Sequence, residues 1–363
     1  MKIAFYGSSL LSSYWNGAAT YYRGVLRALA GRGHEITFYE PDAFERQQHR
    51  DIDPPEWARS VVYPATEEAL RGVLAEAGRA DVVVKASGVG VFDRELLEGV
   101  IREARKDALT IFWDVDAAAT LDEMRADPAH PVRRALSDLD LVFTYGGGPP
   151  VIEAYRDFGA RECVPIYNAL DPQTHHPVSP DPAFACDLAF LANRLPDRER
   201  RVEEFFLRPA ELLPDKRFLI GGNGWHDKSM PQNVHAIGHV GTAQHNAFNC
   251  TPLAVLNVAR DSMAEVGFSP ATRVFEAAGA GACLITDAWE GIGMFLEPNR
   301  EVLVARDGQD VAEQLAALTP NRAKAIGQAA LRRVLAEHTY ELRAAAVDAA
   351  LRDTKARLRE VAA

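Results

Sequence analysis

The chain has 363 residues, of which 47% are hydrophobic and 25% charged, so it exceeds the size at which one core keeps growing and predicts two globular domains. Its 51 acidic and 40 basic residues give a formal net charge of −11, which argues against nucleic acid as the main partner, because a phosphate backbone requires a basic stripe. Four widely separated cysteines, a short apolar N-terminus and the lack of any long apolar run lead us to expect a cytoplasmic protein without disulfides or transmembrane segments.

Short apolar runs alternate with helical patterns through the first half of the chain. The runs at residues 2–6, 35–39, 81–86, 109–114, 139–145 and 162–167 are typical of strands. The first helical pattern carries a regular apolar face from Tyr22 to Leu29 and ends at Gly31. This alternation predicts βαβ units, and therefore a doubly wound parallel sheet in an N-terminal domain of residues 1–170.

A proline-rich stretch then interrupts the pattern. Residues 171–186 contain four prolines and predict an extended linker. The alternation restarts with apolar runs at 187–193, 217–222, 234–240, 253–258, 282–287 and 301–306, which predicts a second α/β domain over residues 187–336. The chain from residue 310 is rich in Ala, Leu, Arg and Glu, and we expect helices divided by Pro320, with a last helix at 337–363 that crosses back to the N-terminal domain.

The segment from Ser269 to Asp287 is the most informative part of the chain. Ser269 suits a helix N-cap and Pro270 the first helical position, so the sequence predicts a helix that begins there and stops at the glycines 279 and 281. Arg273 and Glu276 lie three residues apart and share one face of this helix. A helix start with an arginine favours phosphate, and a carboxylate one turn later can accept two sugar hydroxyls, so the segment predicts a nucleotide site.

Other polar residues of the second domain follow predicted strands. Arg194 and Arg198 stand near the start of a helix, where an anionic ligand would meet the helix dipole, whereas Arg200 and Arg201 are typical of solvated surface. Trp225 fits a core position better than a stacking platform for a base. The histidines near residue 240 invite a zinc site, but their spacing along a strand is too wide for a shared metal, so we expect no metal.

In the first domain, two segments at strand ends are candidates. The loop around Gly17 precedes the first helix, and its backbone amides could meet a phosphate or a sugar, or form ordinary caps. Asp114 and Asp116 end a strand on the same side of the extended chain, and either could act as a general base or hold substrate hydroxyls. For Asp116 the alternative is a side-chain cap on the next helix.

These residues resemble the GT-B glycosyltransferases, and among them the CgeB-like group (spore maturation protein B-like, glycosyl transferases group 1). The match is carried by NVARDSMAEVGFSPATRVFEAAGAGACLITD at 257–287, with looser support from PNREVLVARD, EHTYELR and IYNALDP. The resemblance implies an α/β fold with two Rossmann-like domains facing across a cleft and C-terminal helices packed across their junction. It also implies a UDP- or other nucleotide-diphosphate-sugar donor on the C-terminal domain, no permanently bound cofactor, and a small-molecule, glycan or protein acceptor on the N-terminal domain.

The resemblance also assigns roles to individual residues. Glu276 would bind the nucleotide ribose, and Arg273 and the helix start at Ser269 would lie near the diphosphate, where Arg273 stabilises the leaving group. The remaining positions that match donor-side motifs of the family are Arg194, Arg198, Asn257 and Arg260. A match of the segment around residue 116 to a motif of the N-terminal domain strengthens Asp116. The chain departs from many retaining members at Phe268, because a second glutamate is expected eight positions before the ribose-binding one.

The implied reaction transfers a sugar without a metal, because arginines and a helix dipole can stabilise the leaving diphosphate. An inverting enzyme needs a base, for which Asp116 is the candidate, whereas in a retaining enzyme the leaving phosphate can take the proton. The alternatives are a nucleotide-sugar epimerase, a phosphorylase, a two-domain sugar-binding protein and a nicotinamide-dependent oxidoreductase. The last rests on the βαβ start and Glu40 alone, since the glycine fingerprint is missing.

Overall fold

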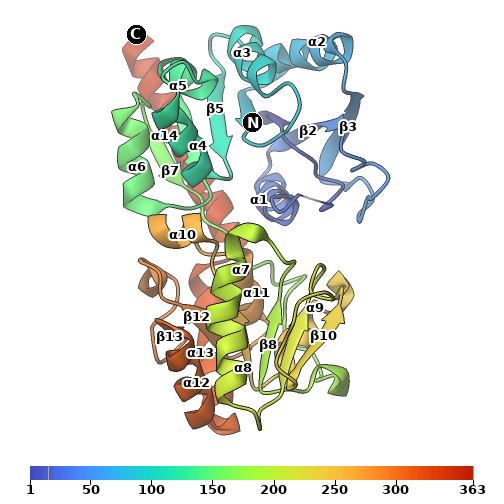
Figure 1. Ribbon diagram of the computed structural model, residues 1–363. Coiled ribbons are helices and arrows are strands. Elements are labelled where there is room, and N and C mark those ends of the chain that lie inside the picture. Colours follow the sequence, from blue (N-terminus) through green and yellow to red (C-terminus); the bar gives the residue numbers. More distant parts are fainter. Residues whose placement is uncertain (15, 363) are drawn as a thin grey trace. The chain divides into compact units, whose positions relative to one another are not determined.

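The computed structural model describes residues 1–14 and 16–362, and the chain divides into two compact units (Figure 1). The first unit consists of Met1–Tyr167 and Tyr340–Ala363, and the second consists of Asn168–Thr339. The second unit is therefore one continuous segment, whereas the first is assembled from both ends of the chain.

The first unit is built on a seven-stranded parallel sheet of order β3-β2-β1-β4-β5-β6-β7. Its strands are β1 (Lys2–Tyr6), β2 (Glu35–Asp42), β3 (Ala58–Pro64), β4 (Val82–Ala86), β5 (Leu109–Asp114), β6 (Leu141–Thr144) and β7 (Cys163–Pro165). Six of them lie where the apolar runs predict strands. The prediction missed β3, because this edge strand carries Arg59 and Ser60 near its start and its apolar run, residues 61–63, is short. The strand forms by pairing with β2.

Helices connect these strands. They are α1 (Ala19–Gly31), α2 (Glu67–Ala75), α3 (Asp93–Glu103), α4 (Ala117–Ala126), α5 (Pro131–Ala135) and α6 (Gly148–Asp157). The apolar face of α1 predicted from the sequence is buried, including Tyr22, Val25 and Leu29. The last helix of the chain, α14 (Tyr340–Ala362), belongs to this unit and packs on α1, where the ring of Tyr340 lies against Gly24.

The second unit has a six-stranded parallel sheet of order β10-β9-β8-β11-β12-β13. The strands are β8 (Leu188–Leu191), β9 (Phe218–Gly221), β10 (Val234–Gly238), β11 (Ala254–Asn257), β12 (Leu284–Asp287) and β13 (Leu303–Ala305). Each falls within a predicted apolar run. Trp225 joins the core of this unit and donates a hydrogen bond from Nε1 to the Ala192 carbonyl at 2.7 Å, as its core assignment predicts.

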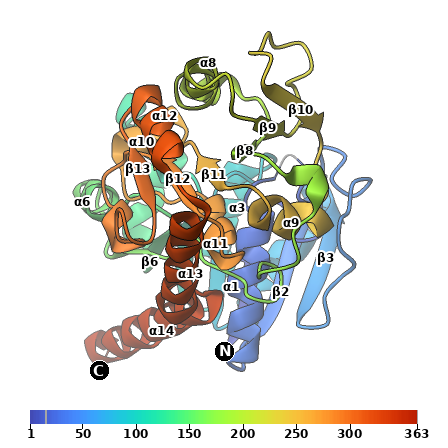
Figure 2. The ribbon, with the colours of Figure 1, turned by 90° about the horizontal axis from the view of Figure 1, so that it is seen from below.

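The helices of this unit are α7 (Pro196–Val202), α8 (Arg208–Leu212), α9 (His245–Cys250), α10 (Asp261–Val266), α11 (Thr272–Gly279), α12 (Gly308–Ala317) and α13 (Pro320–Glu337). One π-helical turn, Glu203–Leu207, joins α7 to α8. Helix α13 begins where Pro320 predicts a division, because Thr319 caps it by accepting a hydrogen bond from the Arg322 amide. Helices α9 and α13 both pack on α11, which is seen from below in Figure 2.

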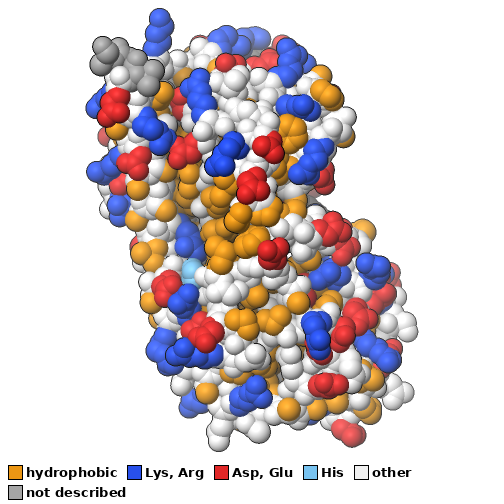
Figure 3. Space-filling model, turned by 90° about the vertical axis from the view of Figure 1, so that its left-hand side faces the viewer, with side chains coloured by type: hydrophobic (Ala, Val, Ile, Leu, Met, Phe, Trp, Pro, Cys, Tyr) orange, Lys and Arg blue, Asp and Glu red, His pale blue; other side chains and the backbone are white. Residues whose placement is uncertain are grey.

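The surface of the chain carries charges of both signs. On the face shown in Figure 3, Lys and Arg side chains are interspersed with Asp and Glu, with apolar side chains between them. None of the helices among the described residues is both long enough and apolar enough to cross a bilayer.

Candidate functional site

Helix α11 carries the two candidate residues Arg273 and Glu276, but it begins later than the sequence predicts. Ser269 is not the N-cap; Ala271 occupies that position with extended backbone, and the helix starts at Thr272. The entry stays extended because Asn168 donates a side-chain hydrogen bond to the Pro270 carbonyl, and the Phe268 amide donates to the Glu290 carbonyl at 2.6 Å. The end of the helix agrees with the prediction, since Gly279 is its last residue.

Arg273 and Glu276 are half-buried on one face of α11. Among the residues that the structure describes, neither side chain makes a hydrogen bond or an ion pair within 4 Å. Burial lowers the pKa of the Arg273 guanidinium, and Glu276 acts in the opposite direction. Neither residue is among the described side chains with buried polar atoms that lack a partner, so the polar groups of both are within reach of solvent and can bind a ligand. This pair is therefore the centre of the candidate site.

The charges of two other arginines of the second unit, Arg273 and Arg260, act on Arg198. Burial, followed by the neighbouring charge of Arg273, lowers the pKa of Arg198 to about 10, and Arg260 acts in the same direction. Arg198 donates from Nη2 to the Asn193 carbonyl, but its buried Nε has no hydrogen-bond partner among the described residues. Arg260 donates from Nε to Asp197 at 2.5 Å. Arg198 therefore has two cationic neighbours and one unused N–H, an arrangement that a bound dianion would stabilise.

Arg194 and Arg201 are engaged in ion pairs instead. Arg194 donates two hydrogen bonds to Glu199, at 2.7 and 3.0 Å, and a third to Asp227 at 2.9 Å. The expectation that Arg201 is solvated surface is wrong, because it donates from Nη2 to the fully buried Asp287 at 2.5 Å. Asp287 in turn accepts from the Ala259 amide, so Arg201 helps to fix the loop after β11.

The remaining donor-side candidates differ in exposure. Asn257 is buried at the end of β11 and donates a hydrogen bond to Thr286 on β12 at 3.0 Å, so its side chain joins two strands. Ser269 is half-exposed in the extended entry to α11. From the sequence, we consider His245 only as a possible zinc ligand. In the structure it lies close enough to Glu276 and Arg273 for their charges to shift its pKa. Its position depends on the packing of α9 on α11, for which the sequence holds no local signal.

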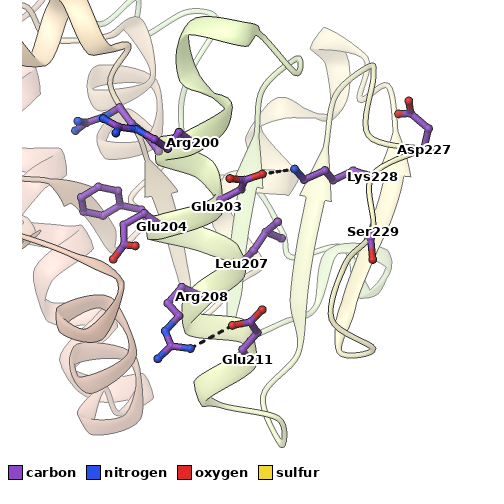
Figure 4. Close-up of a pocket in the computed structure, with 11 residues that line it drawn as sticks. Arg200, Glu203, Glu204, Leu207, Arg208, Glu211, Asp227, Lys228 and Ser229 are labelled. Atoms are coloured by element: carbon purple, nitrogen blue, oxygen red, sulfur yellow. Dashed lines mark hydrogen bonds and ion pairs between the residues drawn. The ribbon is translucent and has the colours of Figure 1, made fainter.

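A separate open pocket of about 770 Å³ lies on the outer side of α7 and α8 (Figure 4). Its charged side chains are largely paired with one another: Lys228 with Glu203, and Arg208 with Glu211 at 3.3 Å. Because these charges already balance, this pocket contrasts with the unpaired groups of α11.

In the first unit, the two aspartates after β5 have different environments. Asp114 is fully buried and accepts hydrogen bonds from Ser87, Thr120, the Asp116 amide and the Tyr155 hydroxyl. Its oxygens are thereby occupied, so Asp114 shapes the strand end and is not available as a base. Burial, together with the charge of Asp114, raises the pKa of Tyr155 well above its usual value.

Asp116 is half-exposed at the N-cap position of α4. Its side chain makes no capping hydrogen bond, so the alternative interpretation of this residue as a side-chain cap is wrong. The helix start is held by its backbone instead, because the Asp116 carbonyl accepts from the Thr120 amide at 3.0 Å.

The loop around Gly17 is held from within the first unit. Buried Asn16 donates to the carbonyls of Ser9 and Ser12, and Gly17 itself is exposed with open space around it. Glu40 is fully buried and accepts from the amides of Leu10 and Leu11 in this loop. A carboxylate used in this way cannot bind a nicotinamide cofactor's ribose, so the oxidoreductase alternative loses the residue on which it rests.

Comparisons with known proteins address the fold. Sucrose-phosphate synthase (tll1590) from Thermosynechococcus elongatus superposes with a TM-score of 0.70 at 15% identity, over 98% of this chain and 100% of that one. Anabaena Alr3699/HepE in complex with UDP and glucose gives a TM-score of 0.66 at 13% identity, over 97% and 100% of the two chains. The chain has the GT-B fold.

Two further comparisons concern another solved structure and a family model that covers part of the chain. T4 phage BGT in complex with its UDP-glucose substrate shares the GT-B fold at 10% identity, with a TM-score of 0.56 over 99% of both chains. Residues 198–349 match the model of a family described as glycosyl transferase-like. No curated protein matches the sequence. The family match includes Arg198, Arg273 and Glu276 and ends within α14, whereas Arg194 and Asp116 lie outside it.

Proposed function

We propose that this GT-B protein is a glycosyltransferase that binds a nucleotide-diphosphate-sugar at α11 and transfers the sugar to an acceptor. The observation that carries the proposal is the half-buried Arg273 and Glu276, whose polar atoms have no partner among the described residues. The family match over residues 198–349 supports the reaction class, and the 257–287 motif supports a place in the CgeB-like group.

The donor site follows from the chemistry of its side chains. Glu276 accepts the two ribose hydroxyls, and Arg273, Arg198 and Arg260 face the diphosphate. The first amides of α11 have no partner within the helix and add their dipole to the same charge. Arg194 stands at the rim, where its ion pairs with Glu199 and Asp227 hold it in place. Asn257 acts indirectly, by holding the end of β11.

Transfer breaks the bond between the anomeric carbon and the diphosphate oxygen, and negative charge grows on the leaving group. Arg273, Arg198 and Arg260 stabilise that charge, so the reaction needs no metal ion. The acceptor loses a proton, which Asp116 takes if the enzyme inverts the anomeric centre and the leaving phosphate takes if it retains. The Gly17 loop and Asp116 belong to the acceptor side, which receives a small molecule, a glycan or a protein.

The donor base is proposed to be uracil, because UDP or UDP-glucose is bound in HepE and in T4 phage BGT. We expect the protein to recognise the donor sugar differently from relatives that have two glutamates. Phe268 replaces the second one with an apolar ring in left-handed backbone (φ 47°), close to Gly291. We expect the protein to act in the cytoplasm.

A thermal-shift panel of UDP-glucose, other nucleotide sugars and NAD tests the proposal. A ligand at 100 times its Kd stabilises the folded state by about 2.7 kcal/mol. We expect a response to one nucleotide sugar that is lost in Glu276→Ala and kept in Glu265→Ala, since Glu265 is exposed on α10. A response to NAD alone, or none to any nucleotide sugar, would contradict the proposal.

A further inference from the structure

Helix α9 begins at His245 beside the candidate donor site. The neutral ring has a defined tautomer, because Nε2 lies 3.3 Å from the Val240 carbonyl, an oxygen that can only accept, and so must carry the hydrogen. Nδ1 is then the free acceptor of the ring. Among the described residues it has no hydrogen-bond partner.

A second histidine is held next to this ring by polar contacts of α9. Asn246 donates to the Thr174 carbonyl at 2.9 Å and accepts from the His176 amide, which fixes the segment after β7 against the start of α9. His175 on that segment is buried, and its ring centroid lies 6.4 Å from that of His245. The rings of His175 and His245 therefore lie close together at the start of α9.

The charged groups that face His245 come from α11 and from this segment. Burial lowers the pKa of His245, Glu276 raises it, and Arg273 and His175 lower it. The pKa of His245 in the free protein is thus lowered from its usual value, mainly by burial, which favours the neutral ring. Arg273 is the member of this set whose charge a bound diphosphate would offset.

Building on the proposed function, we propose that His245 contacts the bound nucleotide-sugar and takes up one proton from solvent at Nδ1 as the donor binds. The proton is favoured because the diphosphate offsets the charge of Arg273 while the carboxylate of Glu276 remains. The new N–H can donate to an oxygen of the ligand. Donor affinity then rises as the pH falls, by about tenfold for each unit by which binding raises the pKa.

Titration calorimetry with UDP-glucose at about pH 6 tests this inference. UDP-glucose is the suitable probe because both of its phosphates are esterified, so the ligand itself takes up no proton in this range. The binding heat is measured in two buffers of different ionisation enthalpy, and the difference gives the number of protons taken up. If another nucleotide sugar gives the larger thermal shift, it replaces UDP-glucose.

We expect net proton uptake by the wild-type protein and its loss in His245→Gln, with binding retained. His235→Gln is the matched control, since His235 is exposed on β10, and its uptake should equal that of the wild type. Binding by the wild type without proton uptake, or unchanged uptake in His245→Gln, would overturn the inference. The wild-type measurement is decisive even if the variant fails to fold. The lack of binding by any nucleotide sugar would instead overturn the proposed function, and this inference with it.

Discussion

The guanidinium of Arg201 and the carboxylate of Asp287 form a buried ion pair at the carboxyl end of β12, with Nη2 and Oδ2 2.5 Å apart. Asp287 is fully buried, and its other contacts are with the Ala259 amide and the Thr286 hydroxyl. The pair therefore supports the loop that leads to Arg260, one of the arginines of the candidate site.

We expect Arg201→Met to lower the free energy of unfolding by about 2 to 3 kcal/mol, because it leaves a buried carboxylate without its cation. Urea unfolding measures this change. Arg200→Met is the control, since Arg200 is the exposed neighbour and should change stability little. Addition of Asp287→Asn should recover part of the loss, and a double variant no more stable than Arg201→Met would argue against the pair as the cause.

Arg273→Gln should abolish the nucleotide-induced thermal shift while leaving the free protein as stable as the wild type, or more so. The reason is that Arg273 is half-buried without a hydrogen-bonded partner among the described residues and repels Arg198 in the absence of an anion. Thermal unfolding with and without UDP-glucose gives both quantities. A large loss of stability without ligand would mean that Arg273 is a structural residue.

Asp116→Asn should lower kcat by about 10² to 10⁴-fold and leave donor affinity unchanged, if this carboxylate takes the acceptor proton. The measurement is turnover with a saturating donor, once an acceptor is known. Asp114→Asn serves as a contrast, because Asp114 holds four hydrogen-bond donors and its change should reduce stability first. Near-normal turnover in Asp116→Asn would favour a retaining reaction.

The packing of α14 on α1 can be tested with two glycines of α1. A Cβ on Gly24 would lie 2.3 Å from the Tyr340 ring, whereas one on Gly31 would meet nothing within 4 Å. We expect Gly24→Ala to destabilise the protein by about 1 to 3 kcal/mol and Gly31→Ala to be neutral or slightly stabilising. Similar unfolding midpoints for the two variants would show that the helices adjust at little cost.

Acid should destabilise the folded protein at His34, whose ring is buried against Asp348 of α14. Burial lowers the pKa of His34, so below about pH 6.5 the unfolded chain binds a proton there that the folded protein does not. This part of the stability is present above that pH and lost as the pH falls. The loss between about pH 7.5 and 5.5 should be larger in the wild type than in His34→Gln, and equal losses would contradict the assignment.

The sequence predicts the strands well because most of them are buried on both faces and have continuous apolar runs. Strand β3 is not predicted, because this edge strand contains Arg59 and Ser60 and takes its conformation from its pairing with β2. Local helix signals fail at Ser269 for a related reason: contacts of Asn168 and Glu290 hold the entry of α11 extended. In the same way, the burial of Arg201 depends on a partner 86 residues away, which no local pattern can indicate.

The two ends of the chain meet in one unit, and this has a consequence for biosynthesis. Residues 168–339 can complete their sheet, with α13 in place, before synthesis of the chain reaches α14. The first unit, although its strands emerge earlier, has to leave the α1 surface around Gly24 uncovered until Tyr340 and the rest of α14 have been translated. We therefore expect the domain that is made second to be the first to reach its final packing on the ribosome.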